Sequence, residues 1–227
     1  MNKRYEIKYV INKEKFNDVY FDLLKKFKFI KDYPDRIVNS LYYDDFNLNS
    51  LLDNISGNSK REKYRLRWYG DFKSMTNVIF EIKQKHNKMS SKILNKLNHK
   101  TINKEDIKIL FNNQNVFKKY FNQNFFKTFF FEKKNNFLVP QLFVSYHRQY
   151  FKLDNNLRIT FDNAISYKHY DLSLNNWYED NVSIIEIKCD FKKLDYYVDM
   201  LKTISLTSNR SSKYVKGMSI FNKTNYF

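Results

Sequence analysis

Charged and apolar residues alternate along several segments of this chain, and this alternation limits the folds that it can adopt. In each such segment every second residue is mostly charged and the residues between them are apolar. The segments are 4–11, 63–69, 78–85, 157–162 and 183–188. Because successive side chains of a strand point to opposite faces of its sheet, each segment is expected to be a strand with one charged face. The chain is therefore predicted to contain an antiparallel sheet, whose two faces can differ in polarity.

Other patterns complete the expected order of elements. Further strands are predicted at 37–44, 142–151 and 166–170. Apolar residues at three- and four-residue spacing predict helices near residue 12 and over 47–54, 103–132, 192–204 and 212–221. The polar segment 87–98 is either a loop or a continuing strand. With only 3 Gly and 2 Pro among 227 residues, no flexible linker is evident, so residues 1–227 are predicted to form a single domain.

The charged strand faces allow two interpretations. In the first, one face of the sheet lies in water and the other packs on helices. In the second, the charged face lines a channel that holds an anionic ligand, since unpaired buried charge is costly. Arginine favours the second interpretation: only 8 of 41 basic residues are Arg, yet Arg65, Arg67 and Arg158 all lie on charged faces. Their planar guanidinium forks suit phosphate oxygens.

The net charge of +17 points to a polyanionic partner, which could be nucleic acid, an anionic membrane surface or phosphate compounds. Composition alone does not choose among these. Cys189 is the only cysteine, so no internal disulfide can form and a reducing compartment is favoured. No apolar stretch approaches the ~20 residues of a membrane span. The chain is expected to be a cytoplasmic protein.

Eight short segments, in order along nearly the whole chain, carry a family resemblance. They are RYEIKYVI (4–11), SLYYDD (40–45), KYRLRWYG (63–70), FEIKQK (80–85), SYHRQYF (145–151), LRITFD (157–162), IIEIK (184–188) and RSSKYVKG (210–217). In this series the chain resembles the VTC domain family of triphosphate tunnel metalloenzymes, which are related to CYTH phosphatases. The resemblance implies an α+β fold with a closed eight-stranded antiparallel β-tunnel surrounded by helices. It also implies transfer of the terminal phosphoryl group of ATP to polyphosphate.

The resemblance also implies roles for individual residues. The catalytic residues that contact phosphate would be Arg65, Arg67, Lys83, Arg148 and Arg158. Further phosphate-binding residues would be Lys8, Lys92, Arg210, Ser212 and Lys213. Glu186 would bind a metal ion, with Glu6 and Glu81 as further candidates. The ion would be Mn²⁺ or Mg²⁺, since both accept carboxylate oxygens as ligands.

Several alternatives remain open. The same fold could hydrolyse tripolyphosphate or a nucleoside triphosphate, or bind polyphosphate without catalysis. Position 4 is Arg where the hydrolytic relatives have Glu, which favours the polymerase. A nucleic-acid-binding protein is the last alternative, but no helix-turn-helix, zinc-finger or RNP-like motif supports it. The membrane helices of eukaryotic family members have no counterpart here, so a membrane-protein partner stays open. ATP and polyphosphate are the expected partners.

Overall fold

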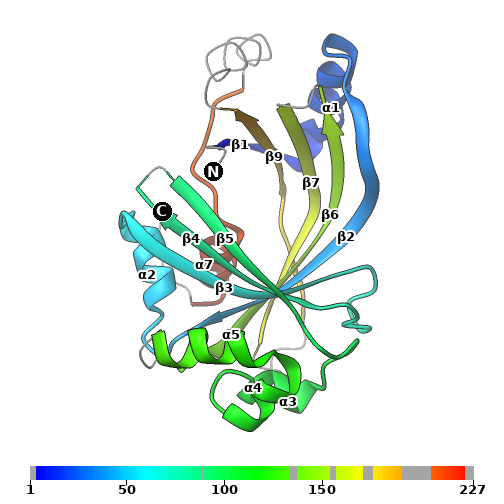
Figure 1. The fold of residues 1–227 in the computed structure, drawn as a ribbon. Helices are drawn as coiled ribbons and strands as arrows, with labels where there is room; N and C mark the ends of the chain where they lie inside the picture. Colours follow the sequence, from blue (N-terminus) through cyan, green and yellow to red (C-terminus); the bar gives the residue numbers. More distant parts are fainter. Residues whose placement is uncertain are drawn as a thin grey trace. The chain divides into compact units, whose positions relative to one another are not determined.

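A computed structural model shows an antiparallel sheet combined with helices (Figure 1). The structure describes residues 4–87, 89–132, 137–153, 157–170, 176–190 and 206–222. Its strands are β1 (Arg4–Asn12), β2 (Ile30–Asp44), β3 (Lys60–Tyr69), β4 (Ile79–His86), β5 (Met89–Lys96), β6 (Val139–Lys152), β7 (Leu157–His169), β8 (Tyr178–Glu179) and β9 (Val182–Asp190). They are hydrogen-bonded in the order β1-β9-β7-β6-β2-β3-β4-β5, and β8 pairs with β7.

The helices of the described residues are short. They are α1 (Phe16–Lys26), α2 (Asn49–Ser56), α3 (Lys104–Ile109), α4 (Gln114–Tyr120), α5 (Gln123–Lys127) and α7 (Lys213–Asn222). A 3-10 turn, Lys13–Lys15, precedes α1, and a π-helical turn, Thr128–Glu132, follows α5. Within the described ranges, no helix is long and apolar enough to cross a membrane.

The predicted α+β fold with antiparallel strands is confirmed. In the part of the chain that the structure describes, the sheet has nine strands rather than eight, because the two-residue β8 adds to it. Within segment 87–98, residues Met89–Lys96 form β5, which agrees with the second of its two alternatives. The two segments predicted at 157–162 and 166–170 form one strand, β7, which continues through Ala164 despite its positive φ of 47°. The helix predicted at 192–204 lies outside the described residues.

Among the described residues the sheet is not closed into a barrel, so the predicted closed tunnel is corrected: closure would require the two end strands of the hydrogen-bonded order to pair with each other. In the described part of the chain, β1 and β5 are the two ends of the hydrogen-bonded order. The outer edge of β1 is instead bonded to a later segment: Tyr9 forms a bridge with Ser208, and Asn209 N donates to Lys8 O at 2.9 Å. This segment occupies backbone groups of β1 that pairing with another strand would need.

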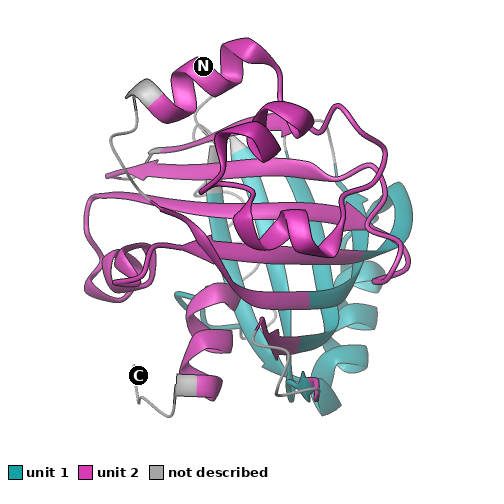
Figure 2. Ribbon diagram, turned by 90° about the horizontal axis from the view of Figure 1, so that it is seen from below, with its two compact units in different colours: residues 1–37, 145–166, 178–212 teal, residues 38–144, 167–177, 213–227 magenta. Residues whose placement is uncertain are grey.

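The chain divides into two compact units, coloured separately in Figure 2. Unit 1 comprises 1–37, 145–166 and 178–212, and its core lies between α1 and the apolar faces of its strands. The ring of Tyr20 meets that of Phe161 at 5.0 Å, and Leu23 is fully buried. The division falls within β2, β6 and β7, and the single domain stays a prediction.

Unit 2 comprises 38–144, 167–177 and 213–227. The apolar face of β3 and β4 packs against α3, α4 and α5 in an aromatic core in which Phe80 and Phe117 are fully buried. This core explains much of the Phe content. In α7, a Cβ on Gly217 would overlap the side chains of Leu142 and Tyr167, so a glycine lets α7 lie close to β6 and β7 within this unit.

Candidate functional site

In unit 2, a group of hydrogen bonds orients the two arginines of β3. Arg65 lies directly opposite Tyr42 of β2 and Glu81 of β4. Its guanidinium donates to both carboxylate oxygens of Glu81, at 2.8 and 3.3 Å, and to the Tyr42 hydroxyl at 2.9 Å. Arg67 contacts the same carboxylate at 3.4 Å. The Arg65 and Arg67 side chains are only 15% and 13% exposed, which disfavours a freely solvated charged face.

Glu81 keeps its negative charge over a wide pH range. Burial by itself would raise the pKa of this carboxyl, but the guanidinium groups of Arg65 and Arg67 outweigh burial and hold the pKa at about 2, below its ordinary 4.5. The carboxylate is therefore ionised at neutral pH and orients both guanidinium forks.

The depressed pKa predicts a specific acid sensitivity. Because the folded-state pKa lies below the unfolded-state value, the contribution of Glu81 to stability is present above pH 4.5 and is lost as the pH falls towards 2. The free energy of unfolding should fall by a total on the order of 3 kcal/mol from this group. Denaturant unfolding of the wild type and of Glu81→Gln should show a smaller acid-induced loss for the variant. Equal losses would contradict this role of Glu81.

Three lysines form a row across the charged face of unit 2. Lys63, Lys83 and Lys92 are successive cross-strand neighbours on β3, β4 and β5. Like charges that lie directly opposite each other destabilise a sheet. A bound polyanion would relieve this repulsion, so the row suits a chain of phosphates. Lys83 and Lys92 were predicted as phosphate-binding residues, and the strand register adds Lys63.

A buried tyrosine network supports Arg65. The ring of Tyr42 stacks on that of Tyr214 at 5.1 Å, and the Tyr214 hydroxyl donates to Asp44 at 2.7 Å. Asp44 also accepts from two backbone N–H groups in the first turn of α2. Burial raises the pKa of Asp44, and the hydrogen bond from Tyr214 opposes this rise. The network fixes the start of α7, where Lys213 directly precedes Tyr214.

In unit 1, charges of opposite sign face each other across β1 and β9. Lys8 lies opposite Glu186, and Glu6 lies opposite Lys188. The Lys8 ammonium is 3.1 Å from a carboxylate oxygen of Glu6 and 3.6 Å from one of Glu186. The other oxygen of Glu186 is 2.5 Å from Lys188 Nζ. One lysine thus joins two of the predicted metal ligands.

The segment with Arg210 and Ser212 runs beside this group. Lys8 Nζ donates to the carbonyl oxygen of Ser211 at 3.3 Å, in addition to the backbone bonds that join residues 208 and 209 to β1. Lys8 is therefore held by two carboxylates and one carbonyl. Arg210 is exposed and Ser212 is half-buried.

The remaining two predicted arginines have different environments. Arg148 forms a bidentate pair with the fully buried Asp162, with N–O distances of 2.5 and 2.7 Å. Burial alone would lower the pKa of Arg148, but Asp162 raises it well above its ordinary value. Arg158, whose side chain is 45% exposed, lies 3.6 Å from Asp32. Asp162 thus orients an arginine, whereas the more exposed Arg158 makes a longer contact with Asp32, whose side chain is 11% exposed.

The carboxylates of unit 1 fit a divalent cation. Mg²⁺ usually takes one or two protein carboxylates and completes its coordination with water and substrate phosphates. Glu6 and Glu186 can supply two, because both contact Lys8. Within the described ranges, no three His, Cys, Asp or Glu side chains form a metal-binding group. Glu81, the third predicted metal ligand, contacts two guanidinium groups, and its role towards a metal ion stays a prediction.

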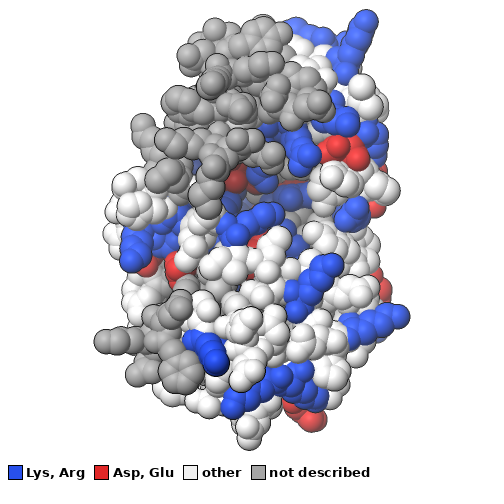
Figure 3. Space-filling view, in the orientation of Figure 1, with Lys and Arg blue, Asp and Glu red and all other residues white. Residues whose placement is uncertain are grey.

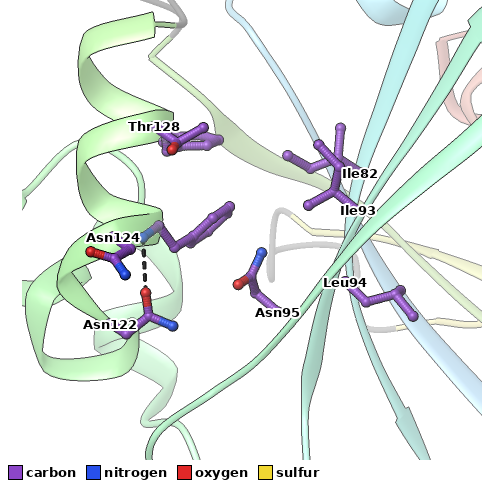
Figure 4. Close-up of a pocket in the computed structure, with 9 residues that line it drawn as sticks. Ile82, Ile93, Leu94, Asn95, Asn122, Asn124 and Thr128 are labelled. Atoms are coloured by element: carbon purple, nitrogen blue, oxygen red, sulfur yellow. Dashed lines mark hydrogen bonds between the residues drawn. The ribbon is translucent and has the colours of Figure 1, made fainter.

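Other features of the molecule suit phosphate less well. A cavity of about 390 Å³ in unit 2 has only apolar, amide and hydroxyl lining residues, among them Ile82, Asn95 and Thr128 (Figure 4). It offers no charge to a polyanion. On the face drawn in Figure 3, Lys and Arg side chains are scattered among uncharged and acidic ones.

The predicted site residues therefore form two groups, one in each unit. The sequence interpretation missed the residues that support them, which are Tyr42, Asp44, Asp32 and Tyr214. The first two lie in SLYYDD and Tyr214 lies in RSSKYVKG, so the segments were noted but these side chains were not. Asp44 and Tyr214 are 170 positions apart, and no local pattern connects them.

Known proteins share the sequence profile and the fold. The profile of the VTC domain family matches residues 3–222. The fold resembles HpAC1 from Hippeastrum, a candidate adenylyl cyclase described as having a dominant triphosphatase activity (TM-score 0.56, 12% identity, covering 96% of this chain and 95% of that chain). It also resembles a candidate adenylate cyclase from Vibrio parahaemolyticus (TM-score 0.52, 14% identity, covering 96% of this chain and 98% of that chain). A third similar structure is PH1819 from Pyrococcus horikoshii (TM-score 0.51, 12% identity, covering 96% of this chain and 98% of that chain).

At these identities the solved structures show similarity of fold alone. No curated protein matches the sequence significantly. The family profile covers nearly the whole chain, including both groups of charged residues. The chain therefore belongs to the VTC domain family.

Proposed function

We propose that this protein is a polyphosphate polymerase, which transfers the terminal phosphoryl group of ATP to the end of a polyphosphate chain. The observation that carries the proposal is the group formed by Arg65, Arg67 and Glu81, in which one buried carboxylate orients two guanidinium forks. Membership of the VTC domain family supports the class of substrate. The triphosphatase activity described for HpAC1, which has a similar fold, agrees with chemistry at a triphosphate.

Phosphoryl transfer depends on alignment and on neutralisation of charge more than on covalent catalysis. In unit 2, Arg65 and Arg67 would contact the oxygens of the transferred group, and their orientation would already be set by Glu81 and Tyr42. The row of Lys83 and Lys92, joined by Lys63, would hold further phosphates by charge. Lys213, at the first residue of α7, would do the same.

In unit 1, Arg148 and Arg158 would contact phosphate, with Asp162 holding Arg148 in place. Arg210 and Ser212 would contribute a guanidinium and a hydroxyl beside Lys8. Glu186, with Glu6, would hold Mg²⁺ or Mn²⁺. Such an ion supplies positive charge to phosphate oxygens as charge develops on the leaving group. Lys8, already between the two carboxylates, would keep their orientation and contact a phosphate oxygen.

The transfer needs no general base, because the attacking oxygen carries no proton. A terminal oxygen of the acceptor chain, already anionic, forms a bond to the γ-phosphorus of ATP. The bond from that phosphorus to the β–γ bridging oxygen breaks, and ADP leaves with the electron pair. Water in the place of the acceptor would give hydrolysis, which is the alternative within the same fold.

The role assigned to Glu186 gives a direct test. Glu186→Gln keeps the size of the side chain but removes its charge, so the rate of ADP release from ATP should fall about 100-fold or more at saturating ATP and metal. The concentrations of Mg²⁺ and Mn²⁺ that give half-maximal activity should also rise. Glu179→Gln is the matched control, because the Glu179 side chain is 80% exposed in the same unit. An unchanged rate and metal dependence in Glu186→Gln would refute this assignment.

A further inference from the structure

An aromatic and basic cluster in unit 1 lies beyond the residues that the proposed reaction uses. The rings of Tyr33 in β2 and Tyr150 in β6 meet edge to face at 5.8 Å. The Arg36 guanidinium lies over both rings, at 5.6 and 5.7 Å from their centroids. Tyr33 is 44% exposed, although such an aromatic side chain gains from burial. An exposed ring beside a guanidinium can accept a flat ligand by stacking.

The cluster is continuous with a proposed phosphate contact. Tyr150 is two residues from Arg148 on β6, and the Arg148 guanidinium lies 6.0 Å from the centre of the Tyr150 ring. Because residues i and i+2 share a face of a strand, a ligand with phosphates at Arg148 would extend along that face towards Tyr150 and Tyr33. A ligand with phosphates at one end and an aromatic ring at the other is a nucleotide.

We propose that Tyr33, Tyr150 and Arg36 form a stacking site for the nucleobase of a nucleoside triphosphate. The inference rests on the proposed function, because it assumes that Arg148 contacts the triphosphate. Stacking uses the face of a base rather than its edge, so it tolerates different bases. The site would therefore hold the phosphoryl donor through its base and would give no affinity to polyphosphate, which has none.

A purely structural role makes a different prediction. If the cluster only stabilised the pairing of β2 with β6, removing one of its rings would lower the free energy of unfolding. It would also weaken the binding of all ligands to the same extent. The test must therefore compare a ligand with a base and a ligand without one. ATP and tripolyphosphate are suitable probes, since both carry three phosphates.

The experiment is calorimetric titration in the cold with Mg²⁺, with chromatography to confirm that each ligand stays intact. Tyr33→Ala should weaken ATP and GTP binding roughly 5- to 100-fold, the range that base stacking supports. Tripolyphosphate binding should change less than about 2-fold. Tyr33→Phe, which keeps the ring, should bind ATP as the wild type does. Tyr33→Leu should weaken ATP and GTP binding as Tyr33→Ala does, because leucine keeps a large apolar side chain on the strand but has no ring.

Tyr178→Ala is the matched control, because Tyr178 is 47% exposed in the same unit and should leave all affinities unchanged. Equal weakening of ATP and tripolyphosphate by Tyr33→Ala, or no weakening of either, would overturn the stacking site while leaving the proposed function intact. Failure of the wild type to bind either ligand would overturn both.

Discussion

Arg65→Ala is expected to lower the rate of ADP formation from ATP by roughly 100- to 1000-fold, the cost of removing one donor from charge that develops in a transition state. The side chain bonds to Glu81 and Tyr42 through three of its N–H groups, so its orientation is set before substrate binds. Lysine keeps the charge but not the planar fork. Arg65→Lys should therefore recover little of the lost rate.

The matched control is Arg61→Ala on the same strand, since Arg61 is a half-buried residue whose guanidinium donates to the carbonyl of Asn58 and contacts neither Glu81 nor Tyr42 in any bond described above. It should keep a rate close to that of the wild type. Thermal unfolding of each variant separates loss of chemistry from loss of fold. A rate for Arg65→Lys within a few-fold of the wild type would show that the fork is unnecessary and would contradict the role of Arg65.

Asp162→Ala is expected to destabilise the protein by about 3–5 kcal/mol, because it leaves the buried Arg148 guanidinium without its carboxylate. The Arg148 side chain is 12% exposed and that of Asp162 is 0% exposed, so water can compensate little. Denaturant unfolding measures the change. The double variant Arg148→Leu/Asp162→Leu should regain much of the stability, since apolar residues can replace a buried ion pair.

The double variant separates stability from function. It should be stable but should have lost much of its activity, because no guanidinium remains at position 148. Asp32→Ala provides a control in which the cations left behind are solvated, since the side chains of Lys152 and Arg158 are 39% and 45% exposed while that of Asp32 is 11% exposed. Its cost should stay below about 1 kcal/mol. A loss of stability for Asp162→Ala no larger than that for Asp32→Ala would contradict the argument.

The sequence predicted the strands where alternation was clear. The predicted segments 4–11, 63–69 and 183–188 fall within β1, β3 and β9 and end within three residues of their bounds. In β2, residues 30–36 were missed because they are mostly exposed on both faces, so burial imposes no period of two there. The predicted strand 142–151 missed the first three residues of β6, which begins at Val139 and has a proline as its second residue.

The site was predicted only in part, for a physical reason. Arginines on strands are visible in the sequence because their type and spacing are local. Their partners are set by strand register and by contacts between distant segments. The bond between Tyr214 and Asp44 and the row formed by Lys63, Lys83 and Lys92 are examples. The pairing of Glu81 with Arg65 is a further example, because it also depends on strand register.

The most direct test of the proposed polymerase follows the terminal phosphoryl group of ATP. The protein is incubated with γ-labelled ATP, a short polyphosphate and Mg²⁺ or Mn²⁺, and the products are resolved by gel and by chromatography. The proposal predicts label in lengthening phosphate chains, with one ADP formed for each phosphate added, and loss of both products in Arg65→Ala. Label found only in free phosphate would contradict the polymerase and indicate a hydrolase, and ATP left intact with either metal would contradict an enzyme.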